Sequence, residues 1–131
     1  MDALALVDQF VDAINAHDPT TMSFMLSENH RFIDSLGIEV RGREEMRKAW
    51  SSYFAMVPDY RLRIDNRLVA GGTIVLLGKA GGTYWTGGDF LPENKWETPA
   101  AIRVAVRDGL IAEWQVYADN EPIRKLMKAT T

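Results

Sequence analysis

Few side chains of this sequence could do chemistry, and their types exclude several classes of site. The 131 residues contain no cysteine, which excludes disulfides, thiolate nucleophiles, thiolate zinc sites and iron–sulfur clusters. His17 and His30 are the two histidines, and imidazole could act in acid–base chemistry or bind a metal. No further metal ligands can be nominated beside them, and a surface or edge position is more common for such histidines. No metal site is therefore expected.

Lys79 stands in the segment that comes nearest to a phosphate-binding loop, Gly78-Lys79-Ala80. Ala80 replaces the required Ser or Thr, and the preceding residues form an apolar strand pattern, so this interpretation is rejected. Lys79 could point inward and hold a carboxylate or an anionic substrate oxygen, or it could lie outward in solvent. The local signatures of serine hydrolases, zinc proteases and dinucleotide-binding proteins do not occur in the sequence either, and no cofactor is expected.

The composition is that of one ordinary globular domain, expected to span residues 1–131. Hydrophobic residues make up 47% of the chain and charged residues 25%, so disorder is excluded as the main state. The net charge is −3, which disfavours a nucleic-acid partner. The amino terminus carries Asp2 where a secretory signal needs basic residues, and no apolar run approaches the roughly 18 residues of a membrane span. We expect a cytoplasmic protein that does not bind membranes.

Four helices and six strands must position any functional group. Apolar residues at helical spacing predict one helix that runs to about His17 and another from Arg43 to Val57, which Pro58 ends. Asp18-Pro19 is a helix-start signal and predicts a short helix over residues 20–26, and a last helix is expected from about Asn120.

The strands alternate with turn signals. Extended segments are expected at 29–36, 38–41, 60–68, 73–85, 96–107 and 110–118. The first two are joined by Asp34-Ser35-Leu36-Gly37, a type I turn pattern, and the last two by the tight-hairpin signal Asp108-Gly109. Glycines gather between Gly71 and Gly88, where they could permit bends. The order of elements predicts an α+β fold with helices packed on one face of a curved antiparallel sheet.

Four stretches, in their order and spacing, resemble one known family. They are Phe10–Asp18 (FVDAINAHD), Phe32–Gly37 (FIDSLG), Arg41-Gly42-Arg43 before a helix, and Asp108–Asp119 (DGLIAEWQVYAD). The chain resembles SnoaL-like proteins of the nuclear transport factor 2-like superfamily, which also includes ketosteroid isomerases, polyketide cyclases and limonene epoxide hydrolases. The resemblance implies a cone-shaped α+β barrel in which a strongly bent antiparallel sheet is wrapped by three N-terminal helices and a short C-terminal helix. It also implies a deep apolar pocket and a homodimer packed through the sheet face.

The resemblance to ketosteroid isomerase places that enzyme's proton-abstracting aspartate on Asp34. A carboxylate at the mouth of an apolar pocket loses hydration, so its pKa rises and it can shuttle a proton. A type I turn also favours aspartate at its first position, so a structural role fits Asp34 equally well. Phe10 stands where the isomerase has its oxyanion-hole tyrosine, and Ala100-Ala101-Ile102 stands where it has a protonated aspartate. Neither can donate a hydrogen bond, so ketosteroid isomerase activity itself is not expected.

Asp119 is the second candidate acid, since a pocket aspartate is the general acid/base in SnoaL-like cyclases. Its alternative role is to cap the last helix. The last-strand pattern of the epoxide hydrolases falls on Trp114, Tyr117 and Asp119, but the acid that completes their charge network is missing. Asp34, Lys79 and Asp119 could form a replacement cluster, with Tyr117 helping to orient the substrate. Strand parity puts Asp119 and Tyr117 on one face and Trp114 on the other, without saying which face lines the pocket.

Aromatic side chains are abundant, and several are expected to form the substrate-binding wall: Phe10, Phe32, Trp50, Phe54, Tyr60, Trp85 and Tyr117. The helical spacing of Trp50 and Phe54 also fits a position in the core. Trp85, just before a glycine-rich loop, could belong to a mobile lid.

The expected function is that of a small cofactor-independent enzyme that acts by proton transfer on an apolar, carbonyl-bearing molecule, as an isomerase, cyclase or hydratase. The alternative is a non-catalytic binding or carrier protein of the same fold. An enzyme should place at least two of Asp34, Lys79 and Asp119 around one cavity, whereas a carrier should leave all three in solvent. A third possibility, a protein-interaction module, would show a filled cone without a cavity near the roughly 300 Å³ lower end of ligand sites.

Overall fold

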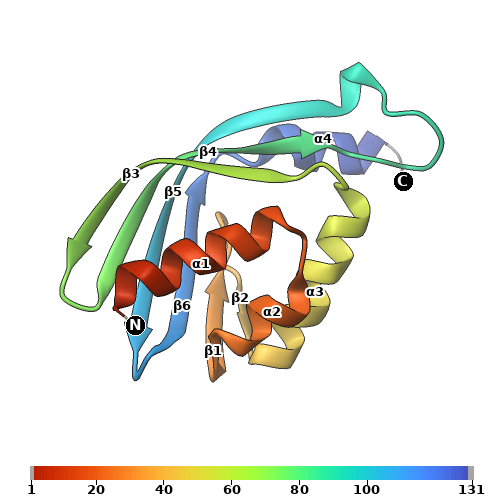
Figure 1. Ribbon diagram of the computed structural model, residues 1–131. Coiled ribbons are helices and arrows are strands. Elements are labelled where there is room, and N and C mark those ends of the chain that lie inside the picture. The colour runs from red at the N-terminus through yellow and green to blue at the C-terminus, as the bar shows by residue number, and fades with distance from the viewer. Residues whose placement is uncertain (1, 130–131) are drawn as a thin grey trace.

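The chain begins with two helices that its own aspartates cap. The computed structural model describes residues 2–129 (Figure 1). Helix α1 covers Ala3–Asn15, and the Asp2 carboxylate accepts a hydrogen bond from the backbone N–H of Ala5 at 2.7 Å. Helix α2 covers Pro19–Phe24, and the Asp18 carboxylate accepts from the N–H of Thr21 at 3.1 Å. These bonds satisfy N–H groups that a helix leaves free in its first turn, so the Asp18-Pro19 start signal is confirmed.

The remaining helices and strands follow the predicted order, and the structure adds one short 3₁₀ helix where the sequence predicted a loop. They are β1 (Leu26–Ile33), β2 (Glu39–Arg41), α3 (Arg43–Met56), β3 (Arg61–Ala70), β4 (Thr73–Thr83), the short 3₁₀ helix η1 (Pro92–Asn94), β5 (Lys95–Arg107), β6 (Leu110–Ala118) and α4 (Glu121–Ala129). Two predicted helices end earlier than expected. Helix α1 ends at Asn15, because His17 adopts a positive φ of 54° that a right-handed helix cannot contain. Helix α2 ends at Phe24, and the chain enters β1 two residues later.

The six strands form one sheet in the order β2-β1-β6-β5-β4-β3. Neighbouring strands are antiparallel except β1 and β6, which run parallel with Phe32 opposite Trp114. The sequence predicted the β1–β2 hairpin and the four-strand run separately. The parallel pair joins them, and no local signal could reveal it, because residues far apart in the sequence form it.

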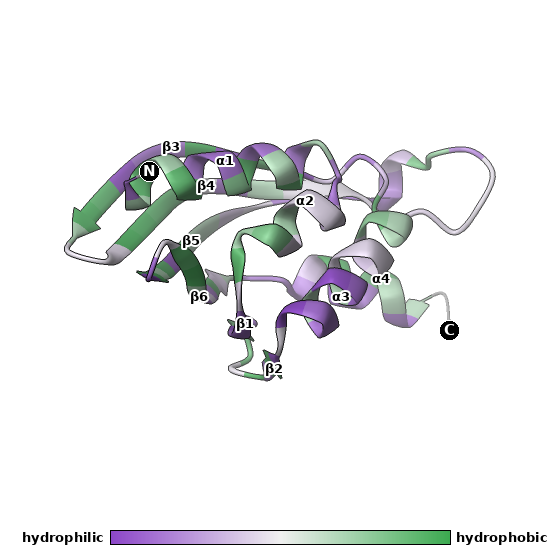
Figure 2. Cartoon of the chain, turned by 60° about the horizontal axis from the view of Figure 1, so that its bottom comes forward, coloured by the Kyte–Doolittle hydropathy of each residue, from purple (hydrophilic) through white to green (hydrophobic). Residues whose placement is uncertain are grey.

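The sheet is curled and does not close. Figure 2 shows it curving from β3 round to β2, with α1, α2 and α3 on its concave side. A register shift between Ile64 and Asn66 bends β3 opposite Gly78. A Cβ atom at Gly78 would lie 1.8 Å from the backbone oxygen of Arg63, so only glycine permits this close approach of the strands. The expected α+β cone is confirmed, with three N-terminal helices and one C-terminal helix in the part of the chain described.

The core lies between α1 and the concave face of the sheet. Val7, Phe10 and Ile14 of α1 are buried, and the Phe10 ring packs against Trp114 of β6 with centroids 5.1 Å apart. Such aromatic contacts add to the free energy of apolar burial. No helix among residues 2–129 combines the length and the apolar character that crossing a membrane requires.

Candidate functional site

A cavity of about 260 Å³ opens on the concave side of the sheet, between the strands and α3. Its walls are mainly apolar, and every strand contributes: Phe32, Val40, Leu62, Ala80, Ala100, Ile102, Trp114, Val116 and Ala118, with Met46, Ala49 and Trp50 from α3. Seven lining residues have side chains with a nitrogen or oxygen atom: Asp34, Trp50, Tyr53, Tyr60, Trp96, Trp114 and Asn120. The volume lies near the roughly 300 Å³ at which ligand sites begin, so the cavity suits a small molecule.

Alternation along β6 determines which side chains enter the cavity. Trp114 and Val116 line it, whereas Glu113, Gln115 and Tyr117 belong to the opposite parity and to the convex face of the sheet. The sequence left open which of these two faces lines the pocket. The face that Asp119 shares with Tyr117 is the convex one.

Among residues 2–129, Asp34 is the only charged residue that lines the cavity, and it is also the first residue of a tight turn. Its Oδ1 accepts hydrogen bonds from the backbone N–H groups of Leu36 and Ile38, each at 2.9 Å. The N–H of Gly37 donates to the Asp34 carbonyl oxygen at 2.9 Å, which closes the turn. Both predicted roles therefore meet in one residue, because the turn that Asp34 begins also fixes its carboxylate at the cavity.

The turn that begins at Asp34 is hydrogen-bonded to the segment that follows β6. Asn120, which follows β6 and also lines the cavity, donates from Nδ2 to the Ser35 hydroxyl at 3.3 Å. This bond ties the β1–β2 turn to the start of α4. Within residues 2–129, Asp34 forms no ion pair, and its Oδ2 makes no hydrogen bond with another protein group.

Two tyrosines line the cavity, Tyr53 from α3 and Tyr60 from the segment that follows it. The rings of Tyr53 and Tyr60 are 5.2 Å apart and nearly perpendicular. Burial raises the pKa of Tyr60 to about 12. Burial, and after it the nearby Tyr60, raise the pKa of Tyr53 well above its usual value of 10.0. Both phenols therefore stay protonated at physiological pH and can donate hydrogen bonds to a bound oxygen atom.

The structure brings four of the predicted site residues to this cavity: Asp34, Phe32, Trp50 and Tyr60. Phe10 and Phe54 are buried in the core instead. The Phe54 ring stacks on His17 with centroids 4.3 Å apart, and His17 Nε2 lies 2.7 Å from the Tyr60 backbone oxygen. Phe54 therefore packs behind the residues that line the cavity and does not line it itself.

Lys79 and Asp119 lie outside the cavity. The Lys79 side chain is 49% exposed, and its Nζ lies 3.9 Å from Glu97 Oε1. Asp119 is exposed, and its Oδ1 accepts from the N–H of Glu121 at 3.0 Å at the start of α4. These are the solvent and capping roles that the sequence left open for them. The cluster of Asp34, Lys79 and Asp119 does not form, and Asp34 alone reaches the cavity.

Trp85 and Tyr117 are also outside it. Trp85 is 38% exposed in the loop between β4 and η1, where its indole N–H donates to the carbonyl oxygen of Gly88 at 2.9 Å. Tyr117 is 53% exposed on the convex face. Tyr53, Trp96 and Asn120 line the cavity although the sequence did not select them as binding residues. The aromatic type and helical spacing of Tyr53 were visible but equally typical of the core.

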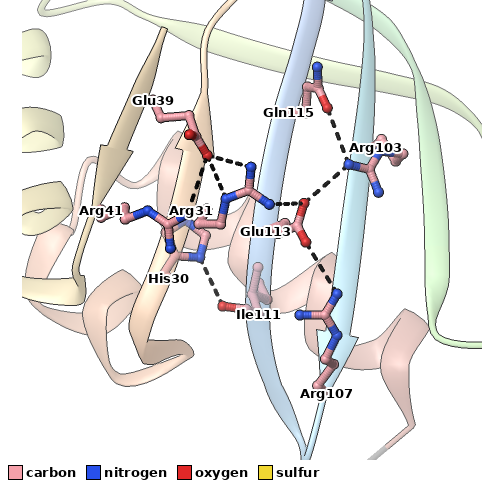
Figure 3. A network of polar contacts seen from close by, with 9 residues as sticks. All are labelled: His30, Arg31, Glu39, Arg41, Arg103, Arg107, Ile111, Glu113 and Gln115. Atoms are coloured by element: carbon pink, nitrogen blue, oxygen red, sulfur yellow. Dashed lines mark hydrogen bonds and ion pairs between the residues drawn. The ribbon is translucent and has the colours of Figure 1, made fainter. Parts of the chain in front are cut away.

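The convex face carries a separate network of charged side chains (Figure 3). Its centre is Glu113, which is 7% exposed and accepts from Arg103 at 3.1 Å and from Arg107 at 3.2 Å. Arg31 lies 3.3 Å from Glu113 and also pairs with Glu39. Burial raises the pKa of Glu113, but the arginines outweigh it and hold that pKa below the usual value of 4.5. Both carboxylate oxygens are occupied, so the network stabilises the sheet and offers no free reactive group.

No group of three or more potential metal ligands occurs among residues 2–129. The only buried side-chain nitrogen or oxygen atoms without a hydrogen-bond partner in this part of the chain are Ser27 Oγ and Trp96 Nε1.

Comparison with known families and structures points to one superfamily. The sequence profile of the SnoaL-like domain matches residues 7–114. Comparison with curated proteins finds no match. Among solved structures, 402 chains match, and the likenesses at low identity concern the fold.

Three of these structures illustrate the likeness. A candidate SnoaL-like polyketide cyclase from Shewanella denitrificans OS-217 has a TM-score of 0.81 at 13% identity, covering 97% of each chain. A protein with a ketosteroid isomerase-like fold from Catenulispora acidiphila DSM 44928, in complex with trimethylamine, has a TM-score of 0.77 at 18% identity, covering 90% of this chain and 88% of the other. An NTF2-like protein from Cytophaga hutchinsonii ATCC 33406 has a TM-score of 0.76 at 18% identity, covering 95% and 96%.

Proposed function

Since this chain belongs to the SnoaL-like domain family, we propose that it is a small enzyme that transfers a proton on a small, apolar, carbonyl-bearing molecule bound in the concave cavity. The observation that carries this proposal is the placement of Asp34. Its carboxylate is the only charged group on a mainly apolar cavity wall, and it has no cationic partner within residues 2–129. A carboxylate that is partly removed from water and not neutralised is suited to accept a proton.

Two kinds of group take part in the proposed reaction: a carboxylate that accepts the proton and phenols that donate hydrogen bonds. The turn holds Asp34 through Oδ1, which leaves Oδ2 to accept the proton from the carbon next to the substrate carbonyl. As that C–H bond breaks, its electron pair moves toward the carbonyl oxygen, where a negative charge develops. The phenol groups of Tyr53 and Tyr60 can donate hydrogen bonds to this oxygen. Asp34 then returns the proton to another carbon, to the oxygen or to the original position, and no cofactor is required.

These tyrosines replace the donors whose absence the sequence indicated. Phe10 and the segment Ala100-Ala101-Ile102 cannot donate hydrogen bonds, and Phe10 is in the core. Tyr53 and Tyr60 supply donors from other positions of the same cavity. The reaction proposed here thus needs one base and two phenols, and it uses neither Lys79 nor Asp119.

The second candidate function is non-catalytic binding of a small molecule. It is favoured by the position of Lys79 and Asp119 outside the cavity, which leaves a single acid at the site. The relative from Catenulispora acidiphila in complex with trimethylamine also supports small-molecule binding as a property available to this fold. Both candidates use the same cavity, so they differ only in whether Asp34 moves a proton.

Deuterium exchange separates the two candidates. Small cyclic ketones in deuterated water are incubated with the protein, and loss of the α-proton signal is followed by NMR. We expect Asp34→Asn to lower the exchange rate by about 10²-fold or more, which is the usual contribution of a general base. Asp119→Asn is the matched control, because Asp119 is exposed and outside the cavity, and it should leave the rate unchanged. An unchanged rate in Asp34→Asn would remove Asp34 from the mechanism, and binding without exchange would favour the second candidate.

The proposal includes pairing of two copies through the convex face of the sheet. This face exposes Leu68, Leu77 and Tyr117, and in Figure 1 the helices α1, α2 and α3 lie on the other side. Sedimentation velocity should give the mass of a homodimer, and Tyr117→Glu should shift the protein toward the monomer. A wild-type monomer at micromolar concentration would contradict the pairing.

A further inference from the structure

We propose that the molecule bound in the concave cavity carries a positively charged amine, held by the Asp34 carboxylate and by the faces of the surrounding aromatic rings. The inference rests on the proposed function, because it assigns a substrate class to the same cavity. It adds that, among small carbonyl-bearing molecules, the cavity binds one with a positively charged amine more tightly than a neutral ketone.

The residues that line the cavity give it a negative charge. Asp34 is the only charged residue among those that line it, and no lysine, arginine or histidine lines it. Two backbone N–H groups stabilise the Asp34 carboxylate, but they do not cancel its charge. Asp34 is half-buried, and its carboxylate has no cation from residues 2–129 beside it. A ligand with a positive charge would therefore find an unpaired negative group at the cavity.

Aromatic rings are dense around the cavity. The Trp50 ring lies near three other rings that line the cavity, with centroids 6.1 Å from Phe32, 6.4 Å from Tyr53 and 6.5 Å from Tyr60. Trp114 and Trp96 line the cavity as well. The face of an aromatic ring is negatively polarised, and a cation within about 6 Å of it gains roughly 0.5–2 kcal/mol. The two phenols stay protonated and add no full charge that would oppose Asp34.

Together, these groups favour positive charge over a neutral ligand of the same shape. A neutral ketone would satisfy the phenols of Tyr53 and Tyr60 but would leave Asp34 without a partner. A protonated amine next to the carbonyl satisfies both, because its charge faces the carboxylate while the carbonyl oxygen accepts from the phenols. When Asp34 takes the proton from carbon, the negative charge passes to the carbonyl oxygen, and the amine remains beside a negative group throughout.

A pair of small probes with similar shape and different charge tests the inference directly. Tetramethylammonium is the cation and tert-butanol the neutral compound, and binding is measured by isothermal titration calorimetry. We expect wild-type protein to bind tetramethylammonium at least tenfold more tightly than tert-butanol. Asp34→Asn should weaken the cation at least tenfold, which corresponds to about 1.4 kcal/mol, and leave tert-butanol unchanged. Asp119→Asn should change neither, because that acid lies outside the cavity.

A second variant keeps the test independent of the Asp34 turn. Trp50→Leu removes a ring from the wall and keeps an apolar side chain, so it should weaken the cation several-fold while circular dichroism shows an unchanged fold. Equal affinity for the two probes, no binding of the cation, or an unchanged cation affinity in Asp34→Asn would each overturn the inference. Exchange of neutral ketones without cation preference would overturn this inference alone. Cation binding without any proton exchange would overturn the proton transfer and support the inference.

Discussion

Replacing Glu113 by glutamine should destabilise the protein by about 2 kcal/mol. The substitution keeps the shape of the side chain and removes its charge, while Arg31, Arg103 and Arg107 remain around it. A charge-assisted hydrogen bond contributes roughly 1.5–3 kcal/mol, and breaking a fully buried pair costs about 3–5 kcal/mol. The arginine side chains are 33–65% exposed and can regain water, so the loss should lie at the lower end of these ranges.

Thermal and urea unfolding measure this loss, and the chain supplies its own control. Glu97 also lies on the convex face near two cations, Arg63 at 3.3 Å and Lys79 at 3.9 Å, but its side chain is 53% exposed. Glu97→Gln should therefore cost about 0.5 kcal/mol or less. For a chain of this size, 2 kcal/mol corresponds to a melting temperature lower by roughly 6–10 °C.

The pH dependence of the same pair of variants provides a second check. The pKa of Glu113 is lower in the folded protein than its usual value of 4.5, so its stabilisation is present above about pH 4.5. It is lost as the pH falls further, through the folded pKa, because the carboxylate is then protonated. The difference between wild type and Glu113→Gln should shrink accordingly in acid. Equal losses in Glu113→Gln and Glu97→Gln at pH 7 would refute the claim that burial makes the Glu113 network important.

Three further predictions concern buried residues. Burial lowers the pKa of His30 below 6.5, so its contribution to the free energy of unfolding should be complete above about pH 6.5 and decrease as the pH falls below that value. Urea unfolding midpoints measured from pH 8 to 5 should therefore depend less on pH in His30→Gln than in the wild type. Gly78→Ala should cost about 3 kcal/mol in thermal unfolding, because the added Cβ would meet the backbone oxygen of Arg63 at 1.8 Å; a loss below 1 kcal/mol would contradict the close strand approach. Tyr60 should ionise only at about pH 12, and Tyr53 should not ionise at a lower pH than Tyr60. In an alkaline titration followed at 295 nm, Tyr60→Phe should therefore lose an increase in absorbance that occurs at about pH 12 in the wild type. If the variant instead lost an increase near pH 10, the burial of Tyr60 would be contradicted.

Local signals in the sequence predicted the order of the four helices and six strands, but not all of their ends and not η1. Asp18-Pro19 predicted a helix start because a carboxylate can accept the free N–H groups there, and Asp18 does so. Asp108-Gly109 predicted a tight hairpin, and both residues have the positive φ values, 55° and 74°, that such a turn requires. These features depend on neighbours within a few residues, so they can be read without the fold.

The candidate site depends on contacts between distant residues, and there the sequence was less informative. The face of β6 that enters the cavity follows from the parallel pairing of β1 with β6, which no local pattern indicates. Lys79 could point to either side of an all-apolar strand segment, and its position beside Glu97 appears only after β4 pairs with β5. Asp34 was identifiable because its turn pattern and its family resemblance fall on the same residue.

A crystal structure of the protein with a molecule whose α-protons it exchanges tests the central claim most directly. The account predicts electron density in the concave cavity, with the exchanging carbon within about 3.5 Å of Asp34 Oδ2 and the carbonyl oxygen within about 2.6–3.2 Å of a Tyr53 or Tyr60 hydroxyl. Density for the molecule only at another place on the protein, with the cavity empty, would contradict it.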